Sequence, residues 1–179
     1  MVFDEFYVKS LVVTHKDFPR RGYHLRDFTP LLADPKAVHM VLDTLAQRYL
    51  DTGVTHVAVL PGKGYLVASM LAYQLNVPII LFQDLGEVPG EVMRERAHGA
   101  GGDRTLELAK NTFTEASRVL LIDDVLASGG TLLAASALIR RQQGQIHEVA
   151  TLIDLPDAGG RQRLADADLA TFTLLAYSD

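Results

Sequence analysis

Residues 119–131 read Val-Leu-Leu-Ile-Asp-Asp-Val-Leu-Ala-Ser-Gly-Gly-Thr, and this stretch carries the strongest structural signal in the chain. Residues 119–122 form a short apolar run that is typical of a strand buried on both faces. Two adjacent carboxylates, Asp123 and Asp124, follow it, and a loop of small residues leads into a helix expected from about Gly130 to Gln142. A buried strand, a glycine-rich turn and a helix in this order indicate a parallel α/β sheet.

Similar apolar runs alternate with helix-like segments along the rest of the chain. Further strands are expected at residues 57–60, 79–82, 149–155 and 171–175, and further helices at 35–50 and 65–75. The pair Asp34-Pro35 predicts the start of one helix, because Asp is a good N-cap and Pro suits the first helical position. The pattern predicts an α/β fold with a parallel sheet of about five strands, flanked by helices. Ligands of such folds bind beyond the carboxyl ends of the strands.

The loop after the two aspartates has the chemistry of a phosphate site. Backbone N–H groups at a helix N-terminus attract anions, and glycine lets the backbone approach closely. The expected phosphate-binding residues are Ala127, Ser128, Gly129, Gly130 and Thr131. The hydroxyls of Ser128 and Thr131 are further donors, and we expect Thr131 also to cap the helix.

Two carboxylates beside such a loop are poor phosphate ligands, because like charges repel. Asp123 and Asp124 suit sugar hydroxyls instead, or a Mg²⁺ ion that bridges a sugar and a diphosphate. The combination predicts a ribose 5-phosphate site. The alternative is a plain strand-to-helix turn with a capping Thr and two solvated aspartates.

Composition narrows the class of protein. The chain has 179 residues, 48% hydrophobic and 22% charged, which predicts one folded domain over residues 1–179. A net charge of −5 at pH 7 argues against non-specific binding to nucleic acid or anionic membranes. The absence of cysteine excludes disulfides and thiolate chemistry. No apolar run has the length of a membrane span, and residues 1–5 lack a signal-peptide pattern, so we expect a cytoplasmic protein.

The segment at 119–131 resembles, at every position, the phosphoribosyl-diphosphate (PRPP) signature of type I phosphoribosyltransferases. The pattern Phe18-Pro19-x-x-Gly22-x-x-x-Arg26-Asp27-x-x-Pro30-Leu31-Leu32 is similar to the N-terminal segment of the adenine-specific members, and residues 152–177 resemble their C-terminal segment. The resemblance covers nearly the whole chain from about Phe18. It implies the type I phosphoribosyltransferase fold, with a small N-terminal hood at residues 1–33.

The resemblance also implies a reaction, in which ribose 5-phosphate moves from PRPP to a purine base, adenine in the closest members, with release of diphosphate. Asp123 and Asp124 would hold the ribose hydroxyls and, directly or through water, Mg²⁺. The loop at 127–131 would bind the 5-phosphate. His24, Leu25 and Arg26 would line the base pocket, and the protein would form a homodimer.

Two departures from the family pattern concern the diphosphate. Pro61-Gly62-Lys63-Gly64 stands where members carry an Asp-Ser-Arg-Gly type loop. We expect Gly62, Lys63 and Gly64 to form the diphosphate loop, with Lys63 assisting the leaving group; the alternative is a simple turn with an exposed lysine. Gln83-Asp84-Leu85-Gly86-Glu87 replaces a basic run, which would repel a diphosphate unless Arg94, Arg96 or Arg104 supplies the charge.

Residues 84–104, with five glycines, are expected to form a long loop that acts as a flexible lid; the alternative is a surface insertion. Ala100 falls where the family has a glutamate that handles the proton of the base, and Glu95, His98 or Asp103 could replace it. These departures leave a second interpretation open. In it, a regulatory protein binds a nucleoside monophosphate and has lost or changed the transfer reaction. A third is an enzyme with a different base or leaving group.

Overall fold

The computed structural model describes residues 2–18, 21–22, 24–99 and 102–178. Pro19, in the N-terminal family pattern, and Ala100, at the position of the family's glutamate, lie outside these residues. The chain divides into two compact units, residues 1–48 and 49–179. Each unit is described by itself.

The first unit combines short helices with a two-stranded ribbon. Its elements are α1 (Glu5–Ser10), β1 (Val13–Lys16), β2 (His24–Asp27), α2 (Thr29–Leu32) and α3 (Pro35–Tyr49). β1 and β2 are antiparallel, and Thr14 lies opposite Arg26. The Asp34 carboxylate accepts a hydrogen bond from the backbone N–H of Ala37 at 2.9 Å, which confirms the helix start predicted from Asp34-Pro35.

The second unit is built on a sheet of five strands in the order β10-β9-β8-β3-β4, and every neighbouring pair is parallel. The strands are β3 (His56–Val59), β4 (Ile79–Leu81), β8 (Arg118–Leu126), β9 (Gln145–Asp154) and β10 (Thr171–Ala176). Residues in the middle of β8 are fully buried, as the apolar run predicted. The predicted α/β fold with a five-stranded parallel sheet is therefore confirmed.

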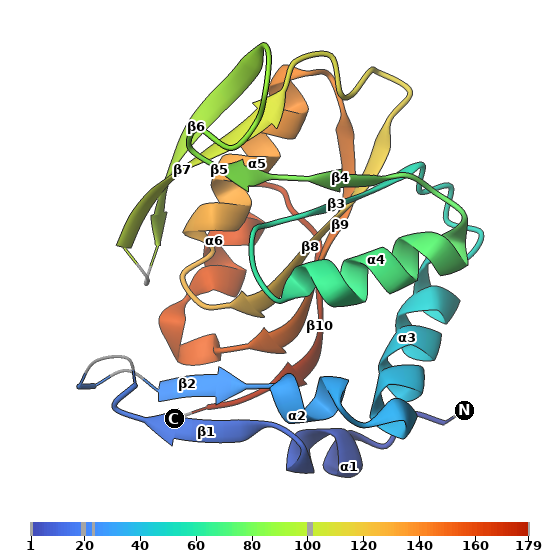
Figure 1. Ribbon diagram of the computed structural model, residues 1–179, viewed down its shortest axis with the longest axis vertical. Helices are drawn as coiled ribbons and strands as arrows, with labels where there is room; N and C mark the ends of the chain where they lie inside the picture. The colour runs from blue at the N-terminus through green and yellow to red at the C-terminus, as the bar shows by residue number, and fades with distance from the viewer. Residues whose placement is uncertain (1, 19–20, 23, 100–101, 179) are drawn as a thin grey trace. The chain divides into compact units, whose positions relative to one another are not determined.

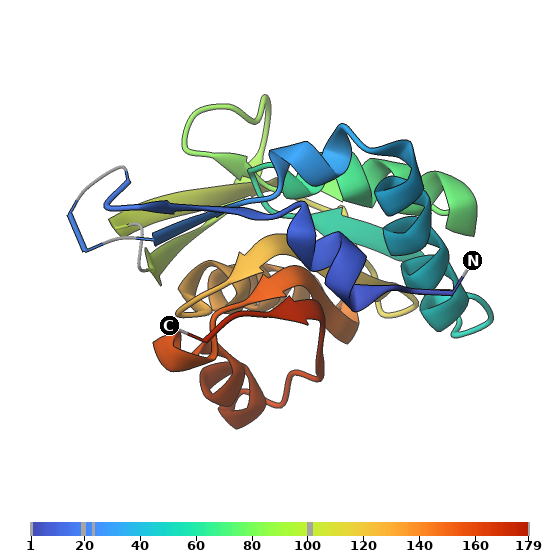
Figure 2. The ribbon, with the colours of Figure 1, turned by 90° about the horizontal axis from the view of Figure 1, so that it is seen from below.

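Helices cover both faces of this sheet. They are α4 (Gly64–Leu75), α5 (Gly130–Arg141) and α6 (Gly160–Asp166), with a single 3₁₀ turn, η1, at Pro156–Ala158. Parallel crossovers are right-handed, and the chain moves outward from β3 in one direction and from β8 in the other. The helices of the two halves therefore fall on opposite faces, with α4 on one side and α5 and α6 on the other (Figures 1 and 2).

Residues 84–104 differ from the expectation. Instead of a long loop they form most of a second, antiparallel sheet in the order β5-β7-β6, with β5 at Gln83–Asp84, β6 at Val92–Gly99 and β7 at Gly102–Ala109. The loop assignment is thus wrong, although the role as a lid stays a prediction. The ribbon places Ala97, Leu106 and Leu108 in the hydrophobic core, and charged side chains pair between its strands. The Arg94 Nε donates to the fully buried Glu107 Oε1 at 2.6 Å, and this contact lowers the pKa of Glu107.

Candidate functional site

Asp123 and Asp124 lie inside β8 and not after it, because β8 continues to Leu126. β8 pairs with β3 only as far as Ile122, whereas its pairing with β9 continues to Leu126. The two aspartates therefore have a strand on one side and the end of β3 on the other. The sequence placed the end of the strand too early because it showed only the apolar run, and not the length of the partner strand.

The Gly62–Gly64 turn that follows β3 lies directly against the aspartates. A Cβ atom built on Gly64 would lie 3.2 Å from the backbone nitrogen of Asp124, and one built on Gly62 would lie 3.3 Å from Asp124 Oδ2. The turn fits there because neither position carries a side chain. Lys63, between the glycines, is exposed and occupies the N-cap position of α4. The structure thus brings the predicted diphosphate loop to the aspartate pair.

The electrostatics of Asp123 and Asp124 favour the binding of a hydrogen-bond donor or a cation to their carboxylates. Burial raises the pKa of Asp123 well above its ordinary value of 3.8, and the neighbouring charge of Asp124 raises it further. The backbone N–H of Asp124 donates to Asp123 Oδ1 at 2.8 Å, which opposes part of this rise in the pKa. A hydroxyl donor or a cation bound between the carboxylates would relieve the repulsion.

The predicted phosphate loop, Ala127–Thr131, joins the end of β8 to the start of α5. Gly129 occupies the N-cap position in the left-handed conformation, with φ at 73°. The prediction that Thr131 caps the helix is wrong, because the chain has already entered the helix at Gly130. The N-terminus of α5 and that of α4 both lie at the carboxyl edge of the sheet, where the partial positive charges of helix N-termini favour an anion.

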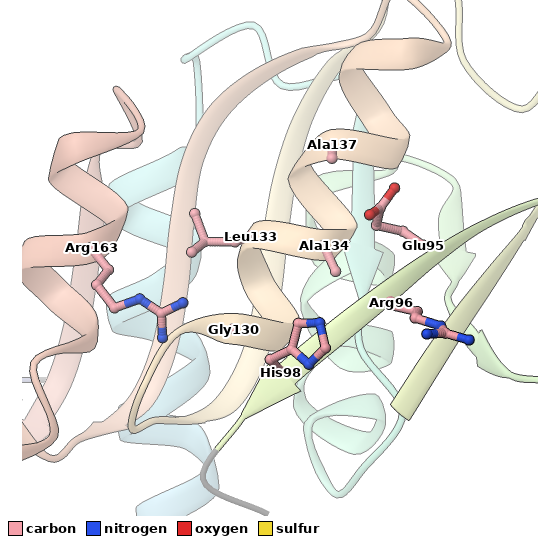
Figure 3. A pocket seen from close by; sticks show the side chains of 8 residues that line it. All are labelled: Glu95, Arg96, His98, Gly130, Leu133, Ala134, Ala137 and Arg163. Carbon is pink, nitrogen blue, oxygen red and sulfur yellow. The ribbon is translucent and has the colours of Figure 1, made fainter. Parts of the chain in front are cut away.

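The hairpin of β6 and β7 touches this loop. A Cβ atom built on Gly130 would lie only 1.9 Å from the His98 carbonyl oxygen, so the end of β6 passes directly over the start of α5 (Figure 3). Ser128 and Thr131 are also close, at 3.8 and 3.7 Å from their hydroxyl oxygens to a Cβ built on Gly99. A cleft of about 210 Å³ lies beside the contact and is lined by Glu95, Arg96, His98, Gly130, Leu133, Ala134, Ala137 and Arg163.

The three arginines considered as substitutes for the missing basic run differ in their partners. Arg94 is paired with Glu107, and Arg104 Nη2 contacts both carboxylate oxygens of Asp84, at 2.7 and 2.6 Å. Asp84 is one of the residues that replace the basic run, so its charge is balanced within the hairpin. In the part of the chain that the structure describes, the side chain of Arg96 forms no hydrogen bond or ion pair.

The three candidates for handling the proton of the base also have partners. Glu95 Oε2 lies 3.0 Å from Arg141 Nη2, and His98 Nδ1 lies 2.8 Å from Asp103 Oδ1. His98 and Asp103 therefore form a pair near the tip of the hairpin.

The predicted base-binding residues His24, Leu25 and Arg26 belong to the first unit. They lie on β2 and are half-buried, and Arg26 Nη1 donates to Thr14 Oγ1 at 2.6 Å. Their proposed role depends on the resemblance of residues 18–32 to the family segment and stays a prediction.

Comparison with known proteins supports the interpretation of this geometry. Residues 31–173 match the family model of the phosphoribosyl transferase domain. The chain belongs to the phosphoribosyltransferase family. It is 47% identical to an adenine phosphoribosyltransferase of Stutzerimonas stutzeri over 178 residues, which are 99% of this chain and 98% of that protein. It is 44% identical to one from a Marinomonas species, over 99% of this chain and 98% of that protein.

Solved structures of phosphoribosyltransferases share the fold. Adenine phosphoribosyltransferase from Thermoanaerobacter pseudethanolicus is 28% identical, with a TM-score of 0.91 over 97% of this chain and 100% of that chain. The enzyme from Giardia lamblia, complexed with 9-deazaadenine, is 26% identical with a TM-score of 0.93 over 98% of this chain and 99% of that chain. The type I phosphoribosyltransferase fold predicted from the motif is thus confirmed.

Asp123 and Asp124 fit a metal ion that is held by one or two carboxylates, and not a site built entirely from protein side chains. Among the described residues, no group of three or more His, Asp or Glu side chains is placed to hold a metal. Mg²⁺ is commonly held by one or two carboxylates together with substrate phosphates, and Asp123 and Asp124 provide such a pair. The described part of the chain also contains no helix that is long and apolar enough to span a membrane.

We predict that Gly130→Ala displaces the end of β6, because a Cβ at this position would overlap the His98 carbonyl oxygen. Backbone amides of residues 92–99 should then exchange hydrogen faster, as measured by mass spectrometry. Gly159→Ala is the control, since its added Cβ meets no atom within 4 Å; its positive φ adds backbone strain that Gly130→Ala does not have. Unchanged exchange at residues 92–99 in Gly130→Ala would contradict the contact.

We also predict that Asp123→Asn stabilises the protein free of substrate and metal. The Asp123 carboxyl has a higher pKa in the folded state than its ordinary pKa of 3.8, so the free-energy cost of folding grows as the pH rises above 3.8. This cost stops growing once the pH exceeds the raised pKa. The gain in melting temperature should therefore be larger at about pH 8 than at about pH 5. Glu115→Gln, at an exposed side chain, controls for the loss of one charge. An equal gain at both pH values, or none, would show that burial does not penalise the charged form.

Proposed function

We propose that the protein catalyses the transfer of ribose 5-phosphate from PRPP to adenine, with release of diphosphate. The observation that carries the proposal is the convergence of three parts at the carboxyl end of β8. These parts are the aspartate pair, the Gly62–Gly64 turn and the Ala127–Thr131 loop. Each has the chemistry for a different part of PRPP.

The loop at residues 127–131 binds the 5-phosphate. Its backbone N–H groups and the N-terminus of α5 supply donors for the anion, and the hydroxyls of Ser128 and Thr131 add two more. The phosphate takes no part in bond breaking. Its binding energy is used to place the ribose C1 carbon, which is the reacting atom.

Asp123 and Asp124 accept hydrogen bonds from the ribose hydroxyls. In the reaction the bond from C1 to the diphosphate oxygen breaks, and its electron pair leaves with the diphosphate. A bond from C1 to a nitrogen of adenine forms, and that nitrogen loses its proton. Positive charge develops on the ribose as the diphosphate leaves, and the two nearby carboxylates stabilise it.

The diphosphate leaves beside the Gly62–Gly64 turn. Lys63 places a positive charge there, and the N-terminus of α4 adds backbone donors. Lysine cannot form the bidentate hydrogen bonds of the arginine found in the family. The positioning of the diphosphate therefore depends more on the backbone N–H groups of the Gly62–Gly64 turn. Mg²⁺ bound with PRPP would neutralise part of the diphosphate charge, with Asp123 and Asp124 as its nearest protein ligands.

By resemblance, His24, Leu25 and Arg26 contribute the base pocket. A homodimer and a cytoplasmic location also stay predictions. The relatives favour the enzyme over a nucleotide-binding regulator that has lost the transfer reaction. They are named adenine phosphoribosyltransferases and are 41–47% identical to this chain over nearly their full length.

A turnover assay tests the proposal. Purified protein, Mg²⁺ and PRPP are mixed with single purine and pyrimidine bases, and the nucleotide and diphosphate are measured by mass spectrometry. We expect the nucleotide of adenine and an equal amount of diphosphate. Folded protein that binds adenosine monophosphate but forms no nucleotide with any base would instead support the regulator.

Replacement of both Asp123 and Asp124 by Asn should lower kcat by about 100-fold or more, because the carboxylates act on the charge that develops in the transition state. Steady-state kinetics measure the loss, and circular dichroism checks that the variant is folded. A double variant at two exposed side chains, Glu5→Gln with Glu115→Gln, is the control for the loss of two charges. Unchanged turnover in the double variant would exclude the assigned role of the pair.

A further inference from the structure

The start of α6 packs against the phosphate loop without any intervening side chain. A Cβ atom built on Gly160 would lie 2.1 Å from the Ala127 carbonyl oxygen, and one built on Gly129 would lie 3.3 Å from the Gly160 carbonyl oxygen. Backbone therefore meets backbone on both sides of the contact. No flexible side chain lies between the backbone of α6 and that of the phosphate loop, so a shift of α6 would move the loop.

Arg163 of α6 also holds the loop by a hydrogen bond. Its Nη1 donates to the carbonyl oxygen of Ser128 at 2.6 Å. Figure 3 shows the guanidinium reaching from α6 towards the start of α5, on the side of the cleft that faces His98. The donor is charged and the acceptor is a backbone carbonyl, so the bond is stronger than one between neutral groups.

This bond fixes the orientation of one peptide unit. In a trans peptide the C=O and the following N–H point in opposite directions. When Arg163 holds the Ser128 oxygen, the N–H of Gly129 must point away from Arg163. Gly129 has no Cβ and is in the left-handed region, so rotation of this peptide has little steric hindrance of its own. A rotated peptide would turn a carbonyl oxygen in place of an N–H towards a bound anion.

A second arginine anchors α6 to the sheet. Arg161 Nε donates to Asp154 Oδ2 at 2.9 Å, and its Nη2 donates to Thr173 Oγ1 at 2.6 Å. Asp154 is only 2% exposed and is the last residue of β9, so this ion pair fixes α6 to the buried end of that strand. Residues two apart on a helix point in different directions. The helix therefore holds the sheet through Arg161 and the phosphate loop through Arg163.

We infer that Arg163 is a positioning residue for the 5-phosphate, which acts through the Ser128–Gly129 peptide and does not touch the substrate. The inference rests on the proposed function, in which this loop binds the phosphate of PRPP. Arg163 should therefore affect how tightly the phosphate end of the substrate binds. It should affect neither the binding of the base nor the rate of the chemical step.

Three variants separate the hydrogen bond from packing and from general loss of charge. Arg163→Met keeps most of the apolar stem and removes the donors, whereas Arg163→Lys keeps a charged donor. Arg140→Met is the matched control, since the exposed Arg140 donates in the same way to a carbonyl oxygen, that of Ala167, at 3.0 Å. Melting temperatures of all three check that the fold is kept.

Arg163→Met should raise the KM for PRPP about fivefold, which corresponds to about 1 kcal/mol for an exposed hydrogen bond. The KM for adenine and kcat should stay within about twofold of the wild type. Arg163→Lys should recover most of the affinity for PRPP, and Arg140→Met should behave as the wild type. Equal changes in all three kinetic constants, or a KM for PRPP in Arg163→Met equal to that of the wild type, would overturn the inference.

Calorimetric binding of ribose 5-phosphate tests the same point without turnover. We expect the dissociation constant to rise about fivefold in Arg163→Met and to stay nearly unchanged in Arg140→Met. A wild type that binds ribose 5-phosphate but forms no nucleotide contradicts the proposed function, whereas equal binding by wild type and Arg163→Met contradicts the role of Arg163. The two failures are therefore distinguishable.

Discussion

β8 pairs with β3 as far as Ile122 and with β9 as far as Leu126, and this difference in length determines where the site lies. The hydrogen bonds to β9 keep the second half of β8 extended after β3 has ended. Asp123 and Asp124 are thereby held on a regular strand and not on a loop, and the turn after β3 lies beside them. A shorter β9 would leave the two carboxylates on a free segment, without the burial that raises the pKa of Asp123.

Close contacts between backbones complete the arrangement. Gly64 lies against the aspartates, Gly130 against the hairpin and Gly160 against the phosphate loop. At each of these positions a side chain would separate two segments that now touch. The site is thus formed by segments from four places in the chain, and their spacing depends on the absence of three Cβ atoms more than on any ion pair.

The sequence was sufficient for the five-stranded sheet, for α4 and α5, and for the turn between β8 and α5, because apolar strands and a glycine-rich turn are local signals. It failed for the segment 84–104, whose glycines and scattered charges indicated a loop. Charges such as Arg94 and Arg104 are accommodated in its strands by pairing with Glu107 and Asp84 across the ribbon. The cap of α5 was misassigned because the left-handed conformation of Gly129 replaces a side-chain cap. Arg163 left no sequence signal, since its partner is a backbone carbonyl.

The pairing of Asp84 with Arg104 has a consequence for how the substrate is captured. PRPP is a multiply charged anion, and a site rich in free cations would attract it over distances of about a Debye length, roughly 8 Å at physiological ionic strength. In this chain the Arg104 charge is balanced by the Asp84 carboxylate on the neighbouring strand, and the chain as a whole is acidic. Long-range attraction of PRPP by the hairpin is thereby reduced, and selection depends more on short-range donors after contact. The rate of substrate association should then depend less on the salt concentration than in an enzyme whose hairpin carries unpaired basic residues.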